Sequence, residues 1–485
     1  MADSRFGEES FFFLHIDTIC RTTAPTCTPS LSIPEAARQM RDQELSGLVV
    51  VEGNAPVGIL SLRDLRDLMA DPPADLQQVT VADIMHRGVI SIRRNAYLFE
   101  AIFKMAKHRI HRLAVIDPQQ GLVGVVNDTD LLSLQARSPL YLSQEMEAAE
   151  SFEALREING RILDMLRHAT QTGADIRSLI QLIAHFNDNL TQRVISLLES
   201  CEGISLPKSA AYLALGSEGR GEQTLRTDQD SAMIFADTLS GEELERCRRF
   251  SERMVEVLEL VGVPRCPGET MASNSQWRRS VSNWKRVLEE WIAVPNGEHM
   301  VNFGMFQDFR TVVGSPEFEQ QLHEFIQAAT RRNSLFFPYV AKNVVRFPAP
   351  IGMFGRIKVE RSGTDRGRVN LKKAGIFAIT AGISLLALEQ NIHQGTTWDK
   401  IEALEKARLF SASDAATFSE AFTTLVNLRL QGQLDDIAND RPPGNSIDPM
   451  RLTERSRSQL RQALRGVNQL LRVLRDHYRL DLISR

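Results

Sequence analysis

The organisation of this chain is set by the stretch Leu213-Ala-Leu-Gly-Ser-Glu-Gly-Arg-Gly-Glu-Gln-Thr-Leu-Arg-Thr-Asp-Gln-Asp-Ser-Ala-Met-Ile-Phe235, in which a glycine-rich turn joins two apolar runs. The apolar residues 211–215 and 232–236 each predict a buried strand. Gly216 and Ser217 end the first run, and the glycines that follow leave the backbone open to a bulky ligand. The pattern predicts a strand, a ligand-facing turn and a second strand.

Two carboxylates stand at the start of the second run. Asp228 and Asp230 are two residues apart, so in an extended chain they point to the same side. Neighbouring carboxylates repel each other unless a cation lies between them, and oxygen ligands favour Mg²⁺. The simpler alternatives are a surface Asp-x-Asp and a helix cap formed by Ser217. The combination favours chemistry on a nucleoside triphosphate.

These residues resemble a known superfamily. The sequence Gly-Ser-Glu-Gly-Arg-Gly-Glu of residues 216–222, followed by Asp228-Gln229-Asp230, is similar to the signature of the polymerase-β-like nucleotidyltransferases. Within it, the match is closest to the uridylyltransferases of nitrogen-regulatory proteins and to bacterial signalling proteins that join cystathionine-β-synthase (CBS) domains to a nucleotidyltransferase. The resemblance implies that Gly216, Ser217 and Arg220 hold the triphosphate.

The resemblance also implies a third acid. Such enzymes use three carboxylates to bind two Mg²⁺ ions, and the third usually lies on a later strand. Residues 301–310, Val-Asn-Phe-Gly-Met-Phe-Gln-Asp-Phe-Arg, are similar to that strand, which makes Asp308 the candidate. The expected catalytic and metal-binding residues are therefore Asp228, Asp230 and Asp308. The alternative is that Asp308 is a surface acid that follows its strand.

Composition limits the class of protein. The chain has 485 residues, 43% of them apolar and 24% charged, which is typical of a soluble protein with two to four domains. The net charge of −4 gives no general attraction to nucleic acid or anionic membranes. Five scattered cysteines and the lack of a signal peptide or membrane span indicate reduced thiols and a cytoplasmic protein.

An internal repeat occupies residues 18–138. Residues 46–52 correspond to residues 111–117, and residues 57–65 correspond to residues 123–131. Each unit reads as helix, strand, strand, helix, and two such units bury each other's sheets. The repeat resembles a tandem pair of CBS domains.

In the CBS family, a Ser/Thr-x-x-Asp step after the second strand holds an adenosine ligand. The resemblance places it at Ser61 and Asp64 in the first repeat, and at Asn127 and Asp130 in the second, where Asn replaces the usual Ser or Thr. An adenine nucleotide is therefore the expected effector. The simpler alternative is that Asp64 and Asp130 are first-turn acids of the next helices.

The expected fold is α+β and multidomain. Its segments are an N-terminal extension (1–17), tandem CBS domains (18–138), a helical linker (139–204), a polymerase-β-like nucleotidyltransferase domain (205–345) and a C-terminal helical, substrate-binding-like bundle (346–485). The linker has helical periodicity after a hinge at residues 139–144. It could transmit a conformational change, form a homodimer contact together with the CBS domains, or simply pack.

Three further features have competing interpretations. Trp277, Trp284 and Trp291 recur every seven residues, which predicts a buried helical stripe in preference to a base-stacking platform. The basic residues 356–373 are interpreted first as a solvated loop, and alternatively as cations that reach the triphosphate or an acidic protein. The last helix, with its apolar stripe opposite arginines, predicts bundle packing in preference to nucleic-acid binding.

The sequence thus predicts a Mg²⁺-dependent nucleotidyltransferase, similar to protein uridylyl- or adenylyltransferases. It would move a nucleoside monophosphate from an NTP to an acceptor, expected to be a regulatory protein, under the control of the CBS domains. The alternative is a non-catalytic signalling scaffold that senses adenine nucleotides. The acceptor and the preferred base are not specified by these residues.

Overall fold

The structure, a computed structural model, describes residues 16–18, 20, 24–43, 45–108, 110–119, 121–127, 139–171, 175–225, 228–352, 355–363, 365–439 and 441–482. The chain divides into two compact units, residues 1–141 and residues 142–485. The second unit contains the predicted nucleotidyltransferase and C-terminal segments, and all of the predicted linker except residues 139–141. Each unit is described by itself.

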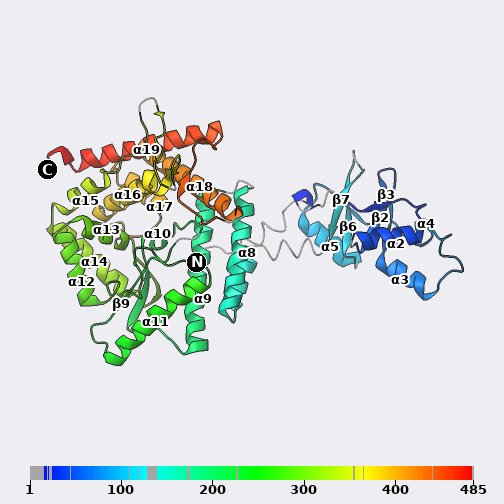
Figure 1. Cartoon of the computed structure of the whole chain (residues 1–485), viewed down its shortest axis with the longest axis horizontal. Coiled ribbons are helices and arrows are strands. Elements are labelled where there is room, and N and C mark those ends of the chain that lie inside the picture. Colours follow the sequence, from blue (N-terminus) through cyan, green and yellow to red (C-terminus); the bar gives the residue numbers. More distant parts are fainter. Residues whose placement is uncertain are drawn as a thin grey trace. The chain divides into compact units, whose positions relative to one another are not determined.

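The first unit contains two sheets of similar construction (Figure 1). The first comprises β1 (Thr26–Cys27), β2 (Gly47–Glu52), β3 (Ala55–Ser61) and β4 (His86–Arg87), with helices α2 (Ile33–Asp42), α3 (Leu62–Ala70) and α4 (Val81–Ile84). The second comprises β5 (Ser91–Arg93), β6 (Arg112–Asp117) and β7 (Gly121–Asn127), with helix α5 (Leu98–His108); the short turn η1 (Ile16–Thr18) precedes both sheets.

The predicted repeat is confirmed at the level of strand register. In each repeat the two long strands pair antiparallel, β2 with β3 and β6 with β7. The register shifts between Val50 and Val51 in the first pair and between Val115 and Ile116 in the second, which are equivalent positions of the repeat. An irregularity at the same place indicates one supersecondary unit used twice.

The second unit begins with three helices. These are α7 (Pro139–Ala148), α8 (Phe152–Gln171) and α9 (Ile176–Glu202). Residues 139–144, predicted as a hinge, lie in helix α7, which Pro139 opens at a position where proline's missing N–H costs no hydrogen bond. The boundary between the two compact units falls within this helix.

The central sheet of the second unit has the strand order β10-β9-β8-β11. Its strands are β8 (Ala210–Ala214), β9 (Ser231–Phe235), β10 (Arg278–Ser280) and β11 (Arg310–Gly314). Strand β8 is antiparallel to both neighbours, whereas β9 and β10 are parallel. The short helix α10 (Gly216–Gly219) follows β8 directly, so the glycine-rich turn lies at the end of a central strand.

Helices cover both faces of this sheet. Tyr212 and Met233 pack in a core with α9 and α11 (Gly241–Leu260), whereas Leu213 and Ile234 pack in a second core with the helices that follow. These helices are α12 (Val281–Ala293), α13 (Gly297–Phe306) and α14 (Glu317–Arg332). In Figure 1, α8 and α9 lie to one side of the sheet and α12 and α14 to the other.

The three tryptophans are buried, as predicted, but only Trp284 and Trp291 share a helix, because Trp277 lies just before β10. Trp277, Trp284 and Trp291 contact one another with ring centroids 6.1 to 6.4 Å apart. Trp284 also donates a hydrogen bond from Nε1 to the carbonyl oxygen of Met233 on β9. The stripe therefore fixes α12 to the sheet and leaves no exposed ring face for a base.

The strand predicted over residues 301–310 is wrong for all but its last residue. Residues 301–306 belong to helix α13, Asp308 lies in the turn that follows, and β11 begins at Arg310. The buried residues Met300, Phe303 and Phe306 recur every three residues, which is a helical spacing. Asn296 caps the helix by accepting a hydrogen bond from the backbone N–H of His299.

The remaining residues form a mostly helical bundle around α16 (Phe377–Glu389), which is buried on nearly every side. The bundle comprises α15 (Phe336–Val344), the π-helical turn η3 (Lys372–Ile376), α17 (Thr397–Lys406), α18 (Ala412–Ala438), α19 (Glu454–His477) and η4 (Leu480–Leu482), with β12 (Val369–Asn370) paired to β13 (Ser446–Ile447). Within the described part of the chain, no helix combines the length and apolarity needed to cross a bilayer.

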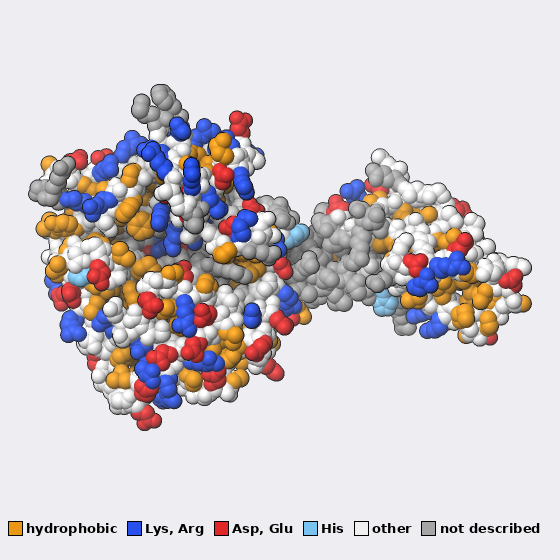
Figure 2. All heavy atoms as spheres, in the orientation of Figure 1, with side chains coloured by type: hydrophobic (Ala, Val, Ile, Leu, Met, Phe, Trp, Pro, Cys, Tyr) orange, Lys and Arg blue, Asp and Glu red, His pale blue; other side chains and the backbone are white. Residues whose placement is uncertain are grey.

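Helix α19 has the amphipathic form that the sequence predicts. Leu460, Leu464 and Val467 are buried against the bundle, and α19 packs along α18. Its arginines lie on the opposite side, and Figure 2 shows Lys and Arg side chains gathered over this part of the second unit. This confirms a packing role for the apolar stripe.

Candidate active site

The glycine-rich turn and the acidic pair lie side by side. The backbone N–H of Leu215 donates to the carbonyl oxygen of Asp230, at 2.9 Å. Gly216 has a φ of +53°, and a Cβ atom added there would lie 3.4 Å from Oδ2 of Asp230. The turn therefore favours glycine at position 216 for its left-handed backbone conformation.

Asp228 and Asp230 converge, together with a third group. One oxygen of each carboxylate and Sγ of Cys266 lie within 4.8 Å of one another. Asp230 is buried, and its Oδ1 has no hydrogen-bond partner among the described residues. Burial, and next the charge of Asp228, raise the pKa of Asp230 to about 6. This is the signature of a buried carboxylate that lies beside a like charge.

A hard divalent cation fits this donor set. Two converging carboxylates, one with an orphaned buried oxygen, are ligands that Mg²⁺ prefers. Cys266 is not a thiolate here, because burial raises its pKa to about 11 and its S–H donates to Asp230. Cys266 was missed in the sequence, where nothing links it to the acids; a β-bridge between Gln229 and Arg265 brings its loop to them.

Asp308 has partners other than the acidic pair. Its Oδ1 lies 2.5 Å from Nζ of Lys400, its Oδ2 lies 2.8 Å from an Arg220 nitrogen, and Ser384 donates to both oxygens. Burial alone would raise the pKa of Asp308, but Lys400 and then Arg220 lower it to about 2. The structure thus places Asp308 in a buried ion cluster, and it is not in the group formed by Asp228, Asp230 and Cys266.

Arg220 is already engaged. Its guanidinium bonds Glu222 at 2.9 Å as well as Asp308, and only 11% of its side chain is exposed. Glu222 in turn accepts a hydrogen bond from the backbone N–H of Thr397 at the start of α17. Arg220 therefore ties the glycine-rich turn to the C-terminal bundle, whereas the sequence predicts that it binds phosphate.

Two other cations lie near the acids. Lys372, on the π-helical turn η3, lowers the pKa of Asp230, and π-helical turns are frequent at functional sites. Arg429 on α18 is buried, and burial lowers its pKa to about 10 although Asp228 opposes this. Lys372 belongs to the basic segment 356–373 noted in the sequence, whereas no sequence pattern near Arg429 marks it as a site residue.

Three of the predicted ligand-binding residues of the two repeats, Ser61, Asp64 and Asn127, are bonded within the protein. Oδ2 of Asp64 accepts hydrogen bonds from the backbone N–H and the hydroxyl of Ser61, both at 2.7 Å, which caps α3. Oδ1 of Asn127 accepts from Nε of Arg112, which also donates to the carbonyl oxygen of Gly47 in the first repeat. Asp130 lies outside the described residues.

Comparisons with known families agree with this architecture. A family model described as "Putative nucleotidyltransferase DUF294" matches residues 160–298, and one described as "Putative nucleotidyltransferase substrate binding domain" matches residues 334–478. The CBS domain model matches residues 16–71 and 81–137. The chain therefore belongs to the family of proteins that join tandem CBS domains to this nucleotidyltransferase and its substrate-binding domain.

Individual relatives match over shorter stretches. An uncharacterized protein of Methanocaldococcus jannaschii is 28% identical over 109 residues, 22% of this chain and 35% of the relative. The inosine-5'-monophosphate dehydrogenase of Nitrosopumilus maritimus is 31% identical over 195 residues, 39% of this chain and 37% of the relative. A CBS domain-containing protein of Bacillus subtilis is 34% identical over 110 residues, which are 23% of this chain and 77% of the relative. The chain thus spans little more than a third of the first two relatives.

Solved structures similar to this chain include CBS domain proteins. One is a CBS domain pair in complex with 5'-methylthioadenosine and S-adenosyl-L-methionine (25% identity, 26% of this chain, 97% of that chain, TM-score 0.24). Another is a putative signal-transduction protein with CBS domains from Burkholderia ambifaria (23% identity, 25% and 93%, TM-score 0.24).

Proposed function

We propose that this protein is a Mg²⁺-dependent nucleotidyltransferase that moves a nucleoside monophosphate from an NTP to a hydroxyl of an acceptor, a regulatory protein. The observation that carries the proposal is Asp230: a buried carboxylate with an unpartnered oxygen, next to Asp228 and against the Gly216–Ser217 turn. A buried acid in this state costs free energy unless a ligand with positive charge completes the site.

The chain's own groups have distinct roles in this proposal. The backbone N–H groups of Gly216 and Ser217, in the first turn of α10, have no intrahelical partner and donate to phosphate oxygens together with the Ser217 hydroxyl. Lys372 and Arg429 offset the charge of the triphosphate. Arg220 positions the turn through Glu222 and Asp308, without touching the nucleotide.

The reaction is a displacement at the α-phosphorus. The acceptor oxygen forms a bond to the α-phosphorus, the bond to the bridging oxygen breaks, pyrophosphate leaves, and the hydroxyl proton passes to solvent. Asp228 and Asp230 would hold Mg²⁺, which neutralises charge on the phosphates. The resemblance implies two ions with Asp308 as a shared ligand; the bonds of Asp308 to Lys400 and Arg220 favour a single ion on the pair.

An effector that binds the CBS unit regulates the transferase. An adenine nucleotide binds the CBS unit at Ser61 and Asp64, and at Asn127 and Asp130, in place of some of the bonds described above. Two copies of the chain pair through the CBS domains or through α8 and α9. The enzyme works in the cytoplasm, in keeping with five cysteines that form no disulfide among the described residues.

The test is transfer of label. The purified protein is incubated with each α-³²P-labelled NTP, Mg²⁺ and lysate of its source organism, beside the Asp228→Asn/Asp230→Asn variant. Label on one discrete acceptor with the wild-type protein alone supports the proposal and names both the base and the acceptor. Tight Mg²⁺-dependent NTP binding without transfer overturns it in favour of the signalling scaffold.

A further inference from the structure

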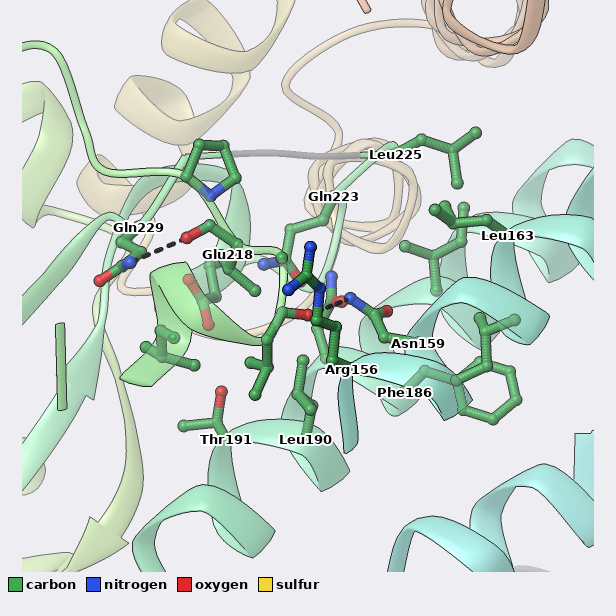
Figure 3. Close-up of a pocket in the computed structure, with 18 of the residues that line it drawn as sticks. Arg156, Asn159, Leu163, Phe186, Leu190, Thr191, Glu218, Gln223, Leu225 and Gln229 are labelled. Atoms are coloured by element: carbon green, nitrogen blue, oxygen red, sulfur yellow. Dashed lines mark hydrogen bonds between the residues drawn. The ribbon is translucent and has the colours of Figure 1, made fainter. Parts of the chain in front are cut away.

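A second cavity lies behind the candidate active site. It has a volume of about 430 Å³ and lies between helices α8 and α9 on one side and α10, residues 223–225 and Gln229 on the other. Figure 3 shows Glu218, Gln223 and Gln229 on one side of it, facing Asn159, Leu163 and Phe186. Its size is within the range of small-molecule sites.

The wall toward the active site carries unpartnered polar atoms. Oε1 of Gln223, Oγ1 of Thr224 and Oε1 of Gln229 are buried and have no hydrogen-bond partner, and the three residues are 4%, 1% and 2% exposed. Each such atom carries a desolvation penalty until a donor reaches it. The Gln229 amide is held in place, because its Nε2 donates to the carbonyl oxygens of Val255 and Val263.

These atoms define the chemistry of the occupant. The two glutamine oxygens are acceptors only, and the Thr224 hydroxyl both accepts and donates. Glu218 adds a carboxyl group to the same wall, with Asp188 and Asp230 close enough to act on it electrostatically. An occupant must therefore bring N–H donors, and a positive charge suits the surrounding acids.

The opposite wall is apolar. Leu163, Leu166 and Phe186 face the cavity, with Leu190 beside them. The exposed side chain of Arg156 also lines it. A cluster of water molecules could satisfy the oxygens but gains nothing from this apolar half.

We propose that this cavity binds a small organic cation, in which an ammonium or amidinium head reaches Gln223, Thr224 and Gln229 and an apolar body packs on α8 and α9. None of the predicted catalytic or nucleotide-binding residues lines the cavity.

The site is placed to act on the nucleotide site. Gln229 stands between Asp228 and Asp230, and because side chains alternate along an extended segment it points away from them. Glu218 follows Ser217 directly. An occupant would therefore contact the reverse side of both the turn and the acidic segment. This coupling rests on the proposed function, whereas binding itself does not.

The test uses phenethylamine as the probe, with 2-phenylethyl methyl ether as a donor-free relative. Binding to the full-length protein is measured by ligand-observed NMR and calorimetry. Three variants accompany the wild type: Leu163→Trp fills the cavity, Gln223→Met removes one acceptor, and Leu244→Trp changes an exposed residue of α11 outside it.

We expect phenethylamine to bind at least tenfold tighter than the ether, and at least tenfold weaker to the Leu163→Trp and Gln223→Met variants, with Leu244→Trp unchanged. Equal binding of both probes, or wild-type binding by Leu163→Trp, overturns the proposal. So does no binding at 10 mM, which means that the cavity holds water only.

A second measurement separates this proposal from the proposed function. Mg²⁺-dependent NTP binding is titrated with and without saturating phenethylamine. A changed NTP affinity in the wild type, absent in Leu163→Trp, supports the coupling. Amine binding with unchanged NTP affinity overturns the coupling alone, and NTP transfer without any amine binding overturns the cavity site while the proposed function stands.

Discussion

Lys400 and Asp308 form a buried ion pair, with Nζ of Lys400 2.5 Å from Oδ1 of Asp308 and side chains that are 1% and 4% exposed. Arg220 occupies the other oxygen of the same carboxylate. Through this pair α17 of the C-terminal bundle is joined to the turn before β11 and to α10. Arg220, which the sequence predicts to bind phosphate, is thus part of this ion cluster, three residues after Ser217.

Replacing the lysine should therefore destabilise the fold. Lys400→Met leaves Asp308 buried with Arg220 as its one remaining ion-pair partner among the described residues, and removing one partner of a buried pair typically costs about 3 to 5 kcal/mol. Urea denaturation measures the free energy of unfolding. Lys406→Met, at an exposed position of the same helix, is the control and should change it by less than about 0.5 kcal/mol.

The same pair separates two roles for Asp308. If Asp308 is structural, Asp308→Asn combined with Lys400→Met should be more stable than Lys400→Met alone, because no uncompensated carboxylate remains. If it is a metal ligand, Asp308→Asn should instead abolish Mg²⁺-dependent NTP binding at nearly unchanged stability. A double-mutant cycle with both readouts decides between them.

Local patterns predicted the site where its residues are close in sequence. The convergence of Asp228 and Asp230 follows from their spacing of two, and the turn at Gly216 follows from glycine beside a strand. The partners of Asp308 could not be predicted in this way, because Lys400 is 92 residues away and Ser384 is 76. Burial is a property of the folded chain, so the engagement of Arg220 also had no local signal.

The fold was predicted correctly where a sequence pattern occurs twice, and incorrectly at residues 301–310. The CBS strands were located because the same pattern occurs twice. Residues 301–310 were assigned to a strand because they resemble the strand that carries the third acid in the nucleotidyltransferases. The spacing of Met300, Phe303 and Phe306 is helical, and tertiary burial of that face determines the outcome.

Asp230 should lower the stability of the metal-free protein and be required for Mg²⁺-dependent NTP binding. Its pKa is raised to about 6, so near pH 7.5 the folded protein holds an ionised, buried carboxylate at a cost. In the absence of metal, Asp230→Asn should raise the free energy of unfolding by about 1 to 3 kcal/mol and abolish Mg²⁺-dependent NTP binding. The gain should disappear below about pH 3.8, where the carboxyl is protonated in both states.

Asp237→Asn provides the contrast, because Asp237 lies beyond the opposite end of the strand that Asp230 precedes. Asp237 follows β9 at its far end and accepts a 2.6 Å hydrogen bond from the hydroxyl of Ser282. Its loss should lower stability in urea denaturation. Equal effects of the two substitutions would contradict the assignment of Asp230 as an unpaired acid.

The close packing of α10 gives a steric prediction. A Cβ atom at Gly219 would lie 2.0 Å from the carbonyl oxygen of Asp308 and 3.0 Å from that of Ala214. Because both neighbours are backbone, Gly219→Ala should cost at least about 2 kcal/mol and weaken NTP binding by displacing the turn. Gly304→Ala, in α13 with open space around it, should be neutral or stabilise by up to about 1 kcal/mol. Thermal unfolding of both variants, with NTP titration, is the measurement.

Glu218 should make stability depend on pH. Burial first, then Asp188 and Asp230, raise its pKa to about 8, while Arg310 and Gln223 oppose the rise. The folded protein therefore keeps this proton where the unfolded chain has lost it, so the contribution of Glu218 to stability falls as pH rises from about 4.5 to about 8.

The Glu218→Gln substitution should remove this fall in stability with rising pH. The variant should match the wild type near pH 4.5 and exceed it by about 1 to 3 kcal/mol at pH 8 to 9, a figure reduced from the full pKa shift because the adjoining cavity admits solvent. Urea denaturation at pH 4.5, 6.5 and 8.5 measures the difference, with Glu242→Gln on the exposed start of α11 as the control for losing one charge. A difference that stays constant across these three pH values would show that Glu218 is already ionised in the folded protein, and that solvent or a cation in the cavity balances its charge.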